Sequence, residues 1–346
     1  MKDLCIVGFG LAGLSVARHA ELSNLSLDII SDYSQLSSRV AGGILNPVAV
    51  KRMKPVWKVE HFIDYSRTYY NDLEKTLDAD IYDDLLLKVY IHNIEQENNW
   101  YQAYDKPRLK PYLHRNIEKN KTSIFQADKF GLIHAGIVNL PLLFKTAKAY
   151  YDSKGSWRQE KFEYDKLVIN EQLVEYNNHQ YKHIVFCEGF GVTQNPYFND
   201  LGVYGNKGDY LIIKSEKLQV QNLVKAKYFL IPLGHDLYKF GATYQRQPLN
   251  HLPSNEAKST LIEAFDKMFK VPYTIVDQVC GIRPTTKDRR PIVGNHKKYK
   301  RLHLLNGFGS RGVMMSPKLG SDLINHIFQN EPLDDEVSIQ RIYAQT

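Results

Sequence analysis

A glycine loop near the first residue constrains the fold of this chain more than any other feature. The apolar run Leu4-Cys5-Ile6-Val7 leads into Gly8, Gly10 and Gly13, which have the spacing G-x-G-x-x-G. Glycines allow a tight turn after a strand and a close approach of the backbone to a pyrophosphate, whose charge a helix N-terminus favours. Because this spacing also occurs by chance, the motif depends on its context.

The residues that follow the loop supply that context. Leu11 to Ser23 is rich in Ala and Leu and predicts a helix, and Leu25 to Ser31 predicts a second apolar strand that ends at Asp32. A carboxylate about 20 residues after the glycines can accept hydrogen bonds from a ribose. We therefore expect a dinucleotide-binding β-α-β unit. The alternative is a tight turn that binds no ligand.

A second glycine-rich loop lies at the other end of the chain. Gly307-Phe308-Gly309-Ser310-Arg311-Gly312 follows a predicted strand, Leu302 to Asn306, and precedes a predicted helix, Val313 to Phe328. One nucleotide needs one such loop, so two loops suggest a long cofactor with two ends. A flavin ring suits the second loop, because its N1–C2=O edge becomes negative on reduction and a helix dipole with Arg311 would stabilise that charge. The alternative is an ordinary turn before a helix.

The middle of the chain predicts a different kind of sheet. Between Gly202 and Val279 the sequence alternates between short strands, interrupted by one predicted helix, Ser254 to Lys270, which indicates an antiparallel sheet. A length of 346 residues is long for a single core, so two domains are expected. Pro55 to Leu77 predicts an amphipathic helix, and Ser123 to Ala135 predicts two strands joined by a turn at Lys129 to Gly131.

Composition limits the classes of protein to which this chain can belong. The net charge of +7 fits either an acidic partner such as RNA or a solvated surface. The run His296 to Arg301 predicts an exposed turn, whereas Lys106 to Arg115, close to Trp100, could bind nucleic acid by stacking and phosphate contacts. The three cysteines have no metal or disulfide spacing and suggest a reducing cytoplasm. No apolar run is long enough to span a membrane.

Four ordered motifs give the chain a resemblance to a known family. They are the first glycine loop with Asp32, the segment SSRVAGGI at 37–44, GIRPTT…DRRPIVG at 281–294, and NGFGSRGV at 306–313. Together they resemble the D-amino-acid oxidase/glycine oxidase superfamily of FAD enzymes over nearly the whole chain. The resemblance implies an α/β and α+β fold, with a Rossmann-like FAD-binding domain and an antiparallel-sheet substrate domain built from interleaved segments. The FAD-binding domain would comprise 1–80, 134–200 and 281–346, and the substrate domain 81–133 and 201–280.

The resemblance also implies roles for individual residues. Arg283 matches the arginine that binds the substrate carboxylate in amino-acid-oxidising members, although it could instead pair with Asp288. Arg311 would stabilise the reduced flavin. The family more often has Glu where this chain has Asp32, and the pocket tyrosines of well-studied members have no clear match here. No motif for covalent flavin attachment surrounds the cysteines, so FAD is expected to bind non-covalently. The implied FAD contacts are Gly8, Gly10, Leu11, Ala12, Gly13, Asp32, Tyr33, Ser38, Arg39, Gly42, Gly43, Ile44, Cys187, Glu188, Gly189, Gly307, Gly309, Ser310, Arg311 and Gly312.

The resemblance therefore predicts an FAD-dependent oxidoreductase that oxidises the C–N bond of an amino acid or amine. The hydride would pass to flavin N5, water would hydrolyse the resulting imine, and oxygen or another acceptor would reoxidise the flavin. Two alternatives stay open at this point. One is the flavin oxidase half of a tRNA wobble-uridine-modifying enzyme, which belongs to the same superfamily. The other is a flavin-binding sensor without catalytic activity, since a fold does not guarantee an activity.

Overall fold

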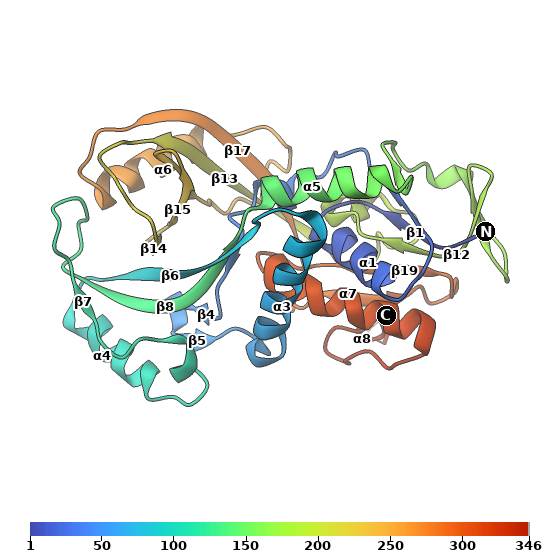
Figure 1. The fold of residues 1–346 in the computed structure, drawn as a ribbon, viewed down its shortest axis with the longest axis horizontal. Helices are drawn as coiled ribbons and strands as arrows, with labels where there is room; N and C mark the ends of the chain where they lie inside the picture. Colours follow the sequence, from blue (N-terminus) through green and yellow to red (C-terminus); the bar gives the residue numbers. More distant parts are fainter. Residues whose placement is uncertain (345–346) are drawn as a thin grey trace.

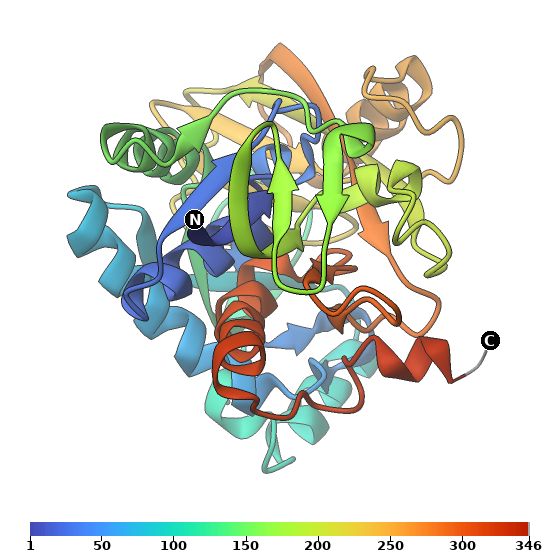
Figure 2. The same ribbon diagram turned by 90° about the vertical axis from the view of Figure 1, so that its right-hand side faces the viewer.

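The computed structural model describes residues 1–344, which form two large β-sheets side by side (Figure 1). The first sheet contains five parallel strands in the order β9-β2-β1-β12-β19, and β10, β11 and β18 add to it in antiparallel pairs. Figure 2 looks onto the end of the molecule that holds this sheet. Its strands are β1 (Lys2–Val7), β2 (Leu27–Ile30), β9 (Trp157–Arg158), β10 (Leu167–Ile169), β11 (Val174–Tyr176), β12 (His179–Phe186), β18 (Ile292–Asn295) and β19 (Leu302–Asn306).

Strand β1 is buried on both faces, which explains its unbroken apolar sequence. Leu4 and Ile6 pack into one hydrophobic cluster with the surrounding helices, whereas Cys5 and Val7 pack into a second cluster on the opposite face. The alternation follows from the two-residue period of a strand. The predicted β-α-β unit is present, because α1 (Leu11–Leu22) connects β1 to its parallel neighbour β2.

The second sheet has the order β17-β13-β16-β15-β14-β6-β8-β3 and is antiparallel except where β14 pairs with β6. The predicted combination of a parallel Rossmann-like sheet with an antiparallel sheet is therefore confirmed. The strands are β3 (Ile44–Leu45), β6 (Tyr82–Ile91), β7 (Glu118–Lys119, paired with β8), β8 (Lys129–Val138), β13 (Tyr204–Lys214), β14 (Leu223–Lys225), β15 (Phe229–Gly234), β16 (Leu237–Gly241) and β17 (Thr274–Thr285), and β4 (Val48–Ala49) pairs separately with β5 (Lys54–Pro55).

The predicted division into chain segments stays a prediction. Strands β8 and β17 each run without interruption across one of the predicted boundaries, at residues 134 and 281. The remaining helices are α2 (Ser37–Val40), α3 (Val59–Leu77), α4 (Ile94–Tyr104), α5 (Leu140–Ser153), α6 (Asn255–Met268), α7 (Gly312–Gln329) and α8 (Gln340–Tyr343). The amphipathic helix predicted within 55–77 and the helix predicted within 254–270 correspond to α3 and α6.

The turn predicted at Lys129 to Gly131 is wrong, because these residues lie inside β8. Gly131 serves packing there. A Cβ atom at this position would lie well under 3.0 Å from the ring of Trp100, which is 2% exposed and donates from Nε1 to His114 O at 2.9 Å. The same burial removes Trp100 from the surface where the sequence suggested stacking on nucleic acid.

Helices α1 and α7 pack closely and are joined by side-chain hydrogen bonds. Ser15 Oγ of α1 donates to Ser316 O of α7 at 2.6 Å, and His19 Nε2 donates to Pro317 O at 2.8 Å. Pro317 has no N–H, so the carbonyl of Val313, one turn earlier, loses its helical donor. The hydroxyl of Tyr70 on α3 replaces that donor at 2.8 Å. The first turn of α7 is therefore held by two other helices.

Burial of His19 makes this interface sensitive to acid. Desolvation lowers the pKa of His19 to about 4, so the native state keeps the ring neutral while the unfolded chain binds a proton near pH 6.5. The stability that His19 contributes is complete above pH 6.5 and is lost as the pH falls toward 4, by up to about 3 kcal/mol. Urea unfolding of wild type and His19→Gln, measured from pH 7.5 to pH 4.5, is expected to show a smaller loss in the variant. The Gln amide can still donate to Pro317 O and does not titrate. Equal losses would contradict this assignment.

Candidate active site

A cavity of about 1220 Å³ lies between the two sheets. Its walls are the carboxyl ends of β1, β2 and β12, the N-termini of α1 and α7, and one face of the second sheet. Ligands of open α/β sheets bind at the carboxyl ends of the strands. Because pockets for single small ligands typically measure about 300–1,000 Å³, this cavity has room for a long cofactor and a second molecule.

The first glycine loop forms one end of the cavity. Gly8 has a φ of +96°, and a Cβ atom there would lie 2.5 Å from Cys187 O. At Gly10 a Cβ atom would lie 2.7 Å from Ser38 Oγ, and at Gly13 it would lie well under 3.0 Å from Gly8 O. Ser38 Oγ accepts a hydrogen bond from the backbone N–H of Leu11 at 3.1 Å. The loop is therefore tight, and it turns the N-terminus of α1 toward the cavity.

Two carboxylates mark the end of the cavity beyond this loop. Asp32 is exposed at the end of β2, and its Oδ1 accepts from Ser34 N–H at 2.9 Å. Glu188 follows β12 and accepts hydrogen bonds from Tyr164 Oη and, at 2.7 Å, from Asn195 Nδ2. Burial raises the pKa of Glu188 to about 7, and the charge of Asp32 adds to this rise. This end of the cavity is acidic and offers acceptors to hydroxyl or amino groups.

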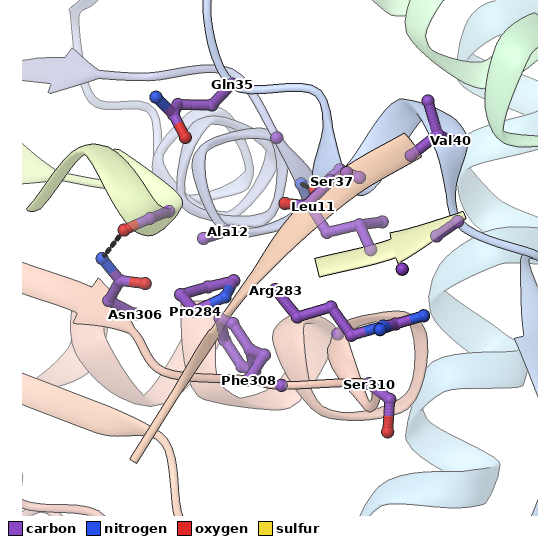
Figure 3. A pocket seen from close by; sticks show the side chains of 18 of the residues that line it. Leu11, Ala12, Gln35, Ser37, Val40, Arg283, Pro284, Asn306, Phe308 and Ser310 are labelled. Carbon is purple, nitrogen blue, oxygen red and sulfur yellow. Dashed lines mark hydrogen bonds between the residues drawn. The ribbon is translucent and has the colours of Figure 1, made fainter. Parts of the chain in front are cut away.

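The second glycine loop lines the cavity beside the N-terminus of α1, since a Cβ atom at Gly312 would lie 3.1 Å from Leu11 Cδ1 (Figure 3). Gly309 N–H donates to Pro284 O, and Asn306 Nδ2 donates to Gly189 O, both at 2.8 Å, so the loop is tied to β17 and to the loop after β12. Arg311 donates from Nη1 to Asn46 O at 3.0 Å and forms no ion pair with a carboxylate in residues 1–344. Burial lowers the pKa of Arg311. An unpaired, desolvated guanidinium at a helix N-terminus is suited to an anion.

Arg283 projects from β17 into the cavity (Figure 3). Its Nη1 lies 3.3 Å from both Asn206 Oδ1 and Thr243 O, and its guanidinium lies 4.6 Å from the ring centre of Tyr244. The guanidinium occupies the space that a side chain at Gly208 would need, since a Cβ atom there would lie well under 3.0 Å from it. Within the described part of the chain, residues 1–344, the charge of Arg283 thus has only neutral partners.

The alternative pairing of Arg283 with Asp288 is wrong. Asp288 Oδ2 accepts instead from Arg341 Nε at 2.9 Å. The structure leaves Arg283 without a carboxylate partner among residues 1–344, and its fork of N–H donors is available to a ligand.

Most residues of the predicted site line the cavity, and three do not. Gly13 lies behind the loop against β1, Arg39 stacks 3.5 Å from the ring centre of Tyr33, and Gly307, with a φ of +79°, turns beside Thr286. The residues that line the cavity as predicted are Gly8, Gly10, Leu11, Ala12, Asp32, Tyr33, Ser38, Gly42, Gly43, Ile44, Cys187, Glu188, Gly189, Arg283, Gly309, Ser310, Arg311 and Gly312.

Sequence reasoning missed the wall formed by the second sheet. Gly208, Lys225 and Phe229 line the cavity, as does Tyr210, whose strand was predicted but whose role was not. None of them belongs to a local motif, and cross-strand pairing brings them together. Within residues 1–344 no three His, Cys, Asp or Glu side chains gather to hold a metal ion, and none of the helices described is long and apolar enough to cross a membrane.

The geometry fits an elongated dinucleotide such as FAD. The cavity has a helix N-terminus at each of two glycine loops, an acidic end for a ribose, and an unpaired guanidinium at the second loop. The side chains missing at Gly8 and Gly10 leave backbone exposed where a pyrophosphate needs it.

Comparisons with known proteins agree with this fit. Residues 3–325 match the DAO protein family, described as FAD dependent oxidoreductase. The curated tRNA 5-methylaminomethyl-2-thiouridine biosynthesis bifunctional protein MnmC of Leptospira interrogans is 20% identical over 395 aligned residues. The alignment covers 98% of this chain and 59% of that protein, so the chain spans about 59% of the length of this relative.

Solved structures share the fold over nearly the whole chain. Glycine oxidase from Geobacillus kaustophilus has a TM-score of 0.76 at 19% identity, with 96% of this chain and 95% of that chain covered. Iminodiacetate oxidase from Chelativorans sp. BNC1 also has a TM-score of 0.76, at 16% identity, with 98% of each chain covered.

Proposed function

Because this chain belongs to the DAO family of FAD-dependent oxidoreductases, we propose that it oxidises the C–N bond of an amine that carries a carboxylate, such as an amino acid. One observation supports this proposal above the others. The guanidinium of Arg283, with only neutral partners, shares a cavity with both glycine loops. A planar guanidinium binds a carboxylate through two parallel hydrogen bonds and so fixes its orientation.

In this proposal the residues from the acidic end of the cavity to Arg311 would hold FAD. Gly8 to Ala12 would hold the pyrophosphate, Asp32 the adenosine ribose, and Gly42 with the loop Gly309 to Gly312 the flavin. Arg311 would stabilise negative charge at the pyrimidine edge of the ring. Burial raises the pKa of the Cys187 thiol well above its usual range, which leaves an unreactive thiol beside the cavity and favours non-covalent binding.

The chain's own contribution is to orient the substrate and exclude water. Arg283 holds the carboxylate, and the wall that contains Tyr210 covers the reacting C–N bond. Bound FAD would supply the acceptor for the hydride that leaves the carbon of this bond, while the nitrogen loses a proton. The substrate is thereby oxidised to an imine, which water hydrolyses to a carbonyl compound and an amine.

Anaerobic mixing of the FAD-loaded protein with carboxylate-bearing amines tests this function. Bleaching of the flavin absorbance by at least one of them is expected, at a rate that saturates with concentration. A protein that binds FAD but is reduced by none of them would support a sensor without catalytic activity. A colourless protein that cannot be reconstituted with FAD would contradict the proposal altogether.

A second candidate is oxidation of an amine carried on tRNA. The bifunctional relative aligns with 98% of this chain, and basic side chains line the cavity on the side of Arg283. The segment Lys106 to Arg115 keeps exposed basic side chains outside the cavity, but Trp100 is buried and cannot stack on a base. Retention of tRNA that weakens steeply with salt would favour this candidate, since phosphate contacts release counterions. No retention at low salt would count against it.

A further inference from the structure

The charges that line the cavity are unevenly distributed. Its wall contains five acidic residues, and they gather around Asp32 and Glu188, together with the single lysine Lys161; the other three are Glu160, Glu163 and Asp165. The remaining basic residues of the wall are Lys51, Arg52, Lys225, Lys227, Arg283, Arg289 and Arg311. One carboxylate and one reduced flavin would neutralise only Arg283 and Arg311.

A row across the second sheet places one of the remaining cations. Lys225 pairs with Phe229, Phe229 with Gly241, and Gly241 with Tyr210, so these residues lie side by side on β14, β15, β16 and β13. Directly opposed residues share one face of a sheet, and all four line the cavity. Gly241 leaves room for the ring of Tyr210, because a Cβ atom there would lie 2.7 Å from Tyr210 Cδ1. The row forms a continuous apolar floor that ends in an ammonium group.

Arg283 marks the other end of this floor. Its guanidinium lies over Gly208, two residues before Tyr210 on the same strand and therefore on the same face. Three strand intervals separate β13 from β14, which places the backbones of Tyr210 and Lys225 roughly 14 Å apart on a flat sheet. The two cations thus face one cavity from well-separated positions.

Lys225 is half-buried and has no ion-pair partner among residues 1–344. Its Nζ donates to Lys227 O at 2.6 Å and lies 4.7 Å from the ring centre of Phe229. Desolvation lowers the pKa of Lys225 to about 8, so the ammonium is poorly solvated where it stands. An ammonium has three donors, and toward residues 1–344 Lys225 uses one of them. An anion in the cavity would satisfy the others.

We propose that the substrate is elongated and carries two anionic groups, a carboxylate bound by Arg283 and a second carboxylate or phosphate bound by Lys225 at the opposite end. This inference rests on the proposed function. The apolar floor of Phe229, Gly241 and Tyr210 would contact the chain of atoms between the two anions. Lys227, which is exposed and lies two residues further along the chain, would strengthen the attraction toward this end of the cavity.

Matched amines test this inference. The set consists of N-alkylglycines. Their unbranched alkyl chains increase in length, and each chain (the tail) ends in an amide, a carboxylate or a phosphate. Anaerobic flavin reduction is measured against amine concentration for wild type and Lys225→Met. At the optimal tail length, wild type is expected to half-saturate at a roughly tenfold lower concentration of an anionic tail than of the amide. Lys225→Met should abolish this preference, so that the anionic tails and the amide half-saturate the variant at about the same concentration.

Two further variants serve as controls. Lys225→Arg keeps the charge and should retain most of the preference, whereas Lys217→Met removes an exposed lysine outside the cavity and should behave as wild type. The carboxylate and phosphate tails distinguish the two sources of the second anion, and preference for either supports the inference. Equal saturation by amide and anionic tails in wild type, or equal weakening of both by Lys225→Met, would overturn it while leaving the proposed function intact. If no amine in the set reduces the wild-type flavin, this inference fails, whereas the proposed function is decided by the wider panel of carboxylate-bearing amines.

Discussion

Gly13→Ala is expected to give a folded protein that retains little or no FAD. In an exposed helix this change would be favourable by about 1 kcal/mol, because alanine forms helices better than glycine. Here the added Cβ atom would lie well under 3.0 Å from Gly8 O, and neither the strand nor the helix can yield without moving the glycine loop. The pyrophosphate site and the N-terminus of α1 would then separate. The measurement is the ratio of flavin absorbance to protein after purification and after incubation with excess FAD.

Gly155→Ala provides the matched control for this result. Gly155 has a φ of +64°, so alanine there is strained by about 1 kcal/mol, but no atom lies within 4 Å of the added Cβ atom. This variant should lose some stability and keep its full FAD content. Normal FAD content in Gly13→Ala would contradict the close packing of α1 on the loop, and loss of FAD from both variants would show that general destabilisation is sufficient.

Arg283→Met is expected to lower kcat/KM for carboxylate-bearing amines by about 10²- to 10³-fold, because removing one partner of a hydrogen-bonded charge pair costs roughly 3–4 kcal/mol. The partners of Arg283 in the protein are neutral, namely Asn206 Oδ1 and Thr243 O, so the substitution leaves no unpaired charge and should not unfold the chain. Most of the effect is expected in KM, since the carboxylate is bound equally in the ground state and the transition state.

A pair of substrates separates binding of the carboxylate from general damage. The amine that lacks the carboxylate should react equally slowly with wild type and Arg283→Met. Arg283→Lys should recover only part of the rate, because an ammonium is a point charge and lacks the planar fork of a guanidinium. Equal losses for both substrates in Arg283→Met would remove the assigned role from this residue.

Local sequence was sufficient to predict the half of the candidate site that the two glycine loops form. The loops around Gly8 and Gly309 are each preceded by a buried strand and followed by a helix, so adjacent residues specify both the turn and the anion-binding helix end. Their meeting in one cavity also follows from the topology of parallel strands, whose carboxyl ends lie at the same edge.

The other half depends on pairing between strands far apart in sequence. Lys225 belongs to a strand of three residues, and only its register with Phe229 on β15 brings it to the cavity. Gly208 contributes to the site because its missing side chain leaves room for the guanidinium of Arg283 from β17. Gly131 was misinterpreted for the same reason, since a glycine that admits a distant ring cannot be distinguished by sequence from one that makes a turn.

The cavity wall combines residues from Val7 to Val313, and this has a consequence for the order in which the protein matures. A growing chain displays the first glycine loop early on the ribosome, but it cannot form the complete site until the loop at Gly309 has been made. The apo chain must therefore assemble both sheets before its cofactor can hold them. Free FAD at a hundred times its dissociation constant would then stabilise the assembled protein by about 2.7 kcal/mol. The chain that has bound FAD would thus unfold, and be open to proteolysis, less often than the apo chain.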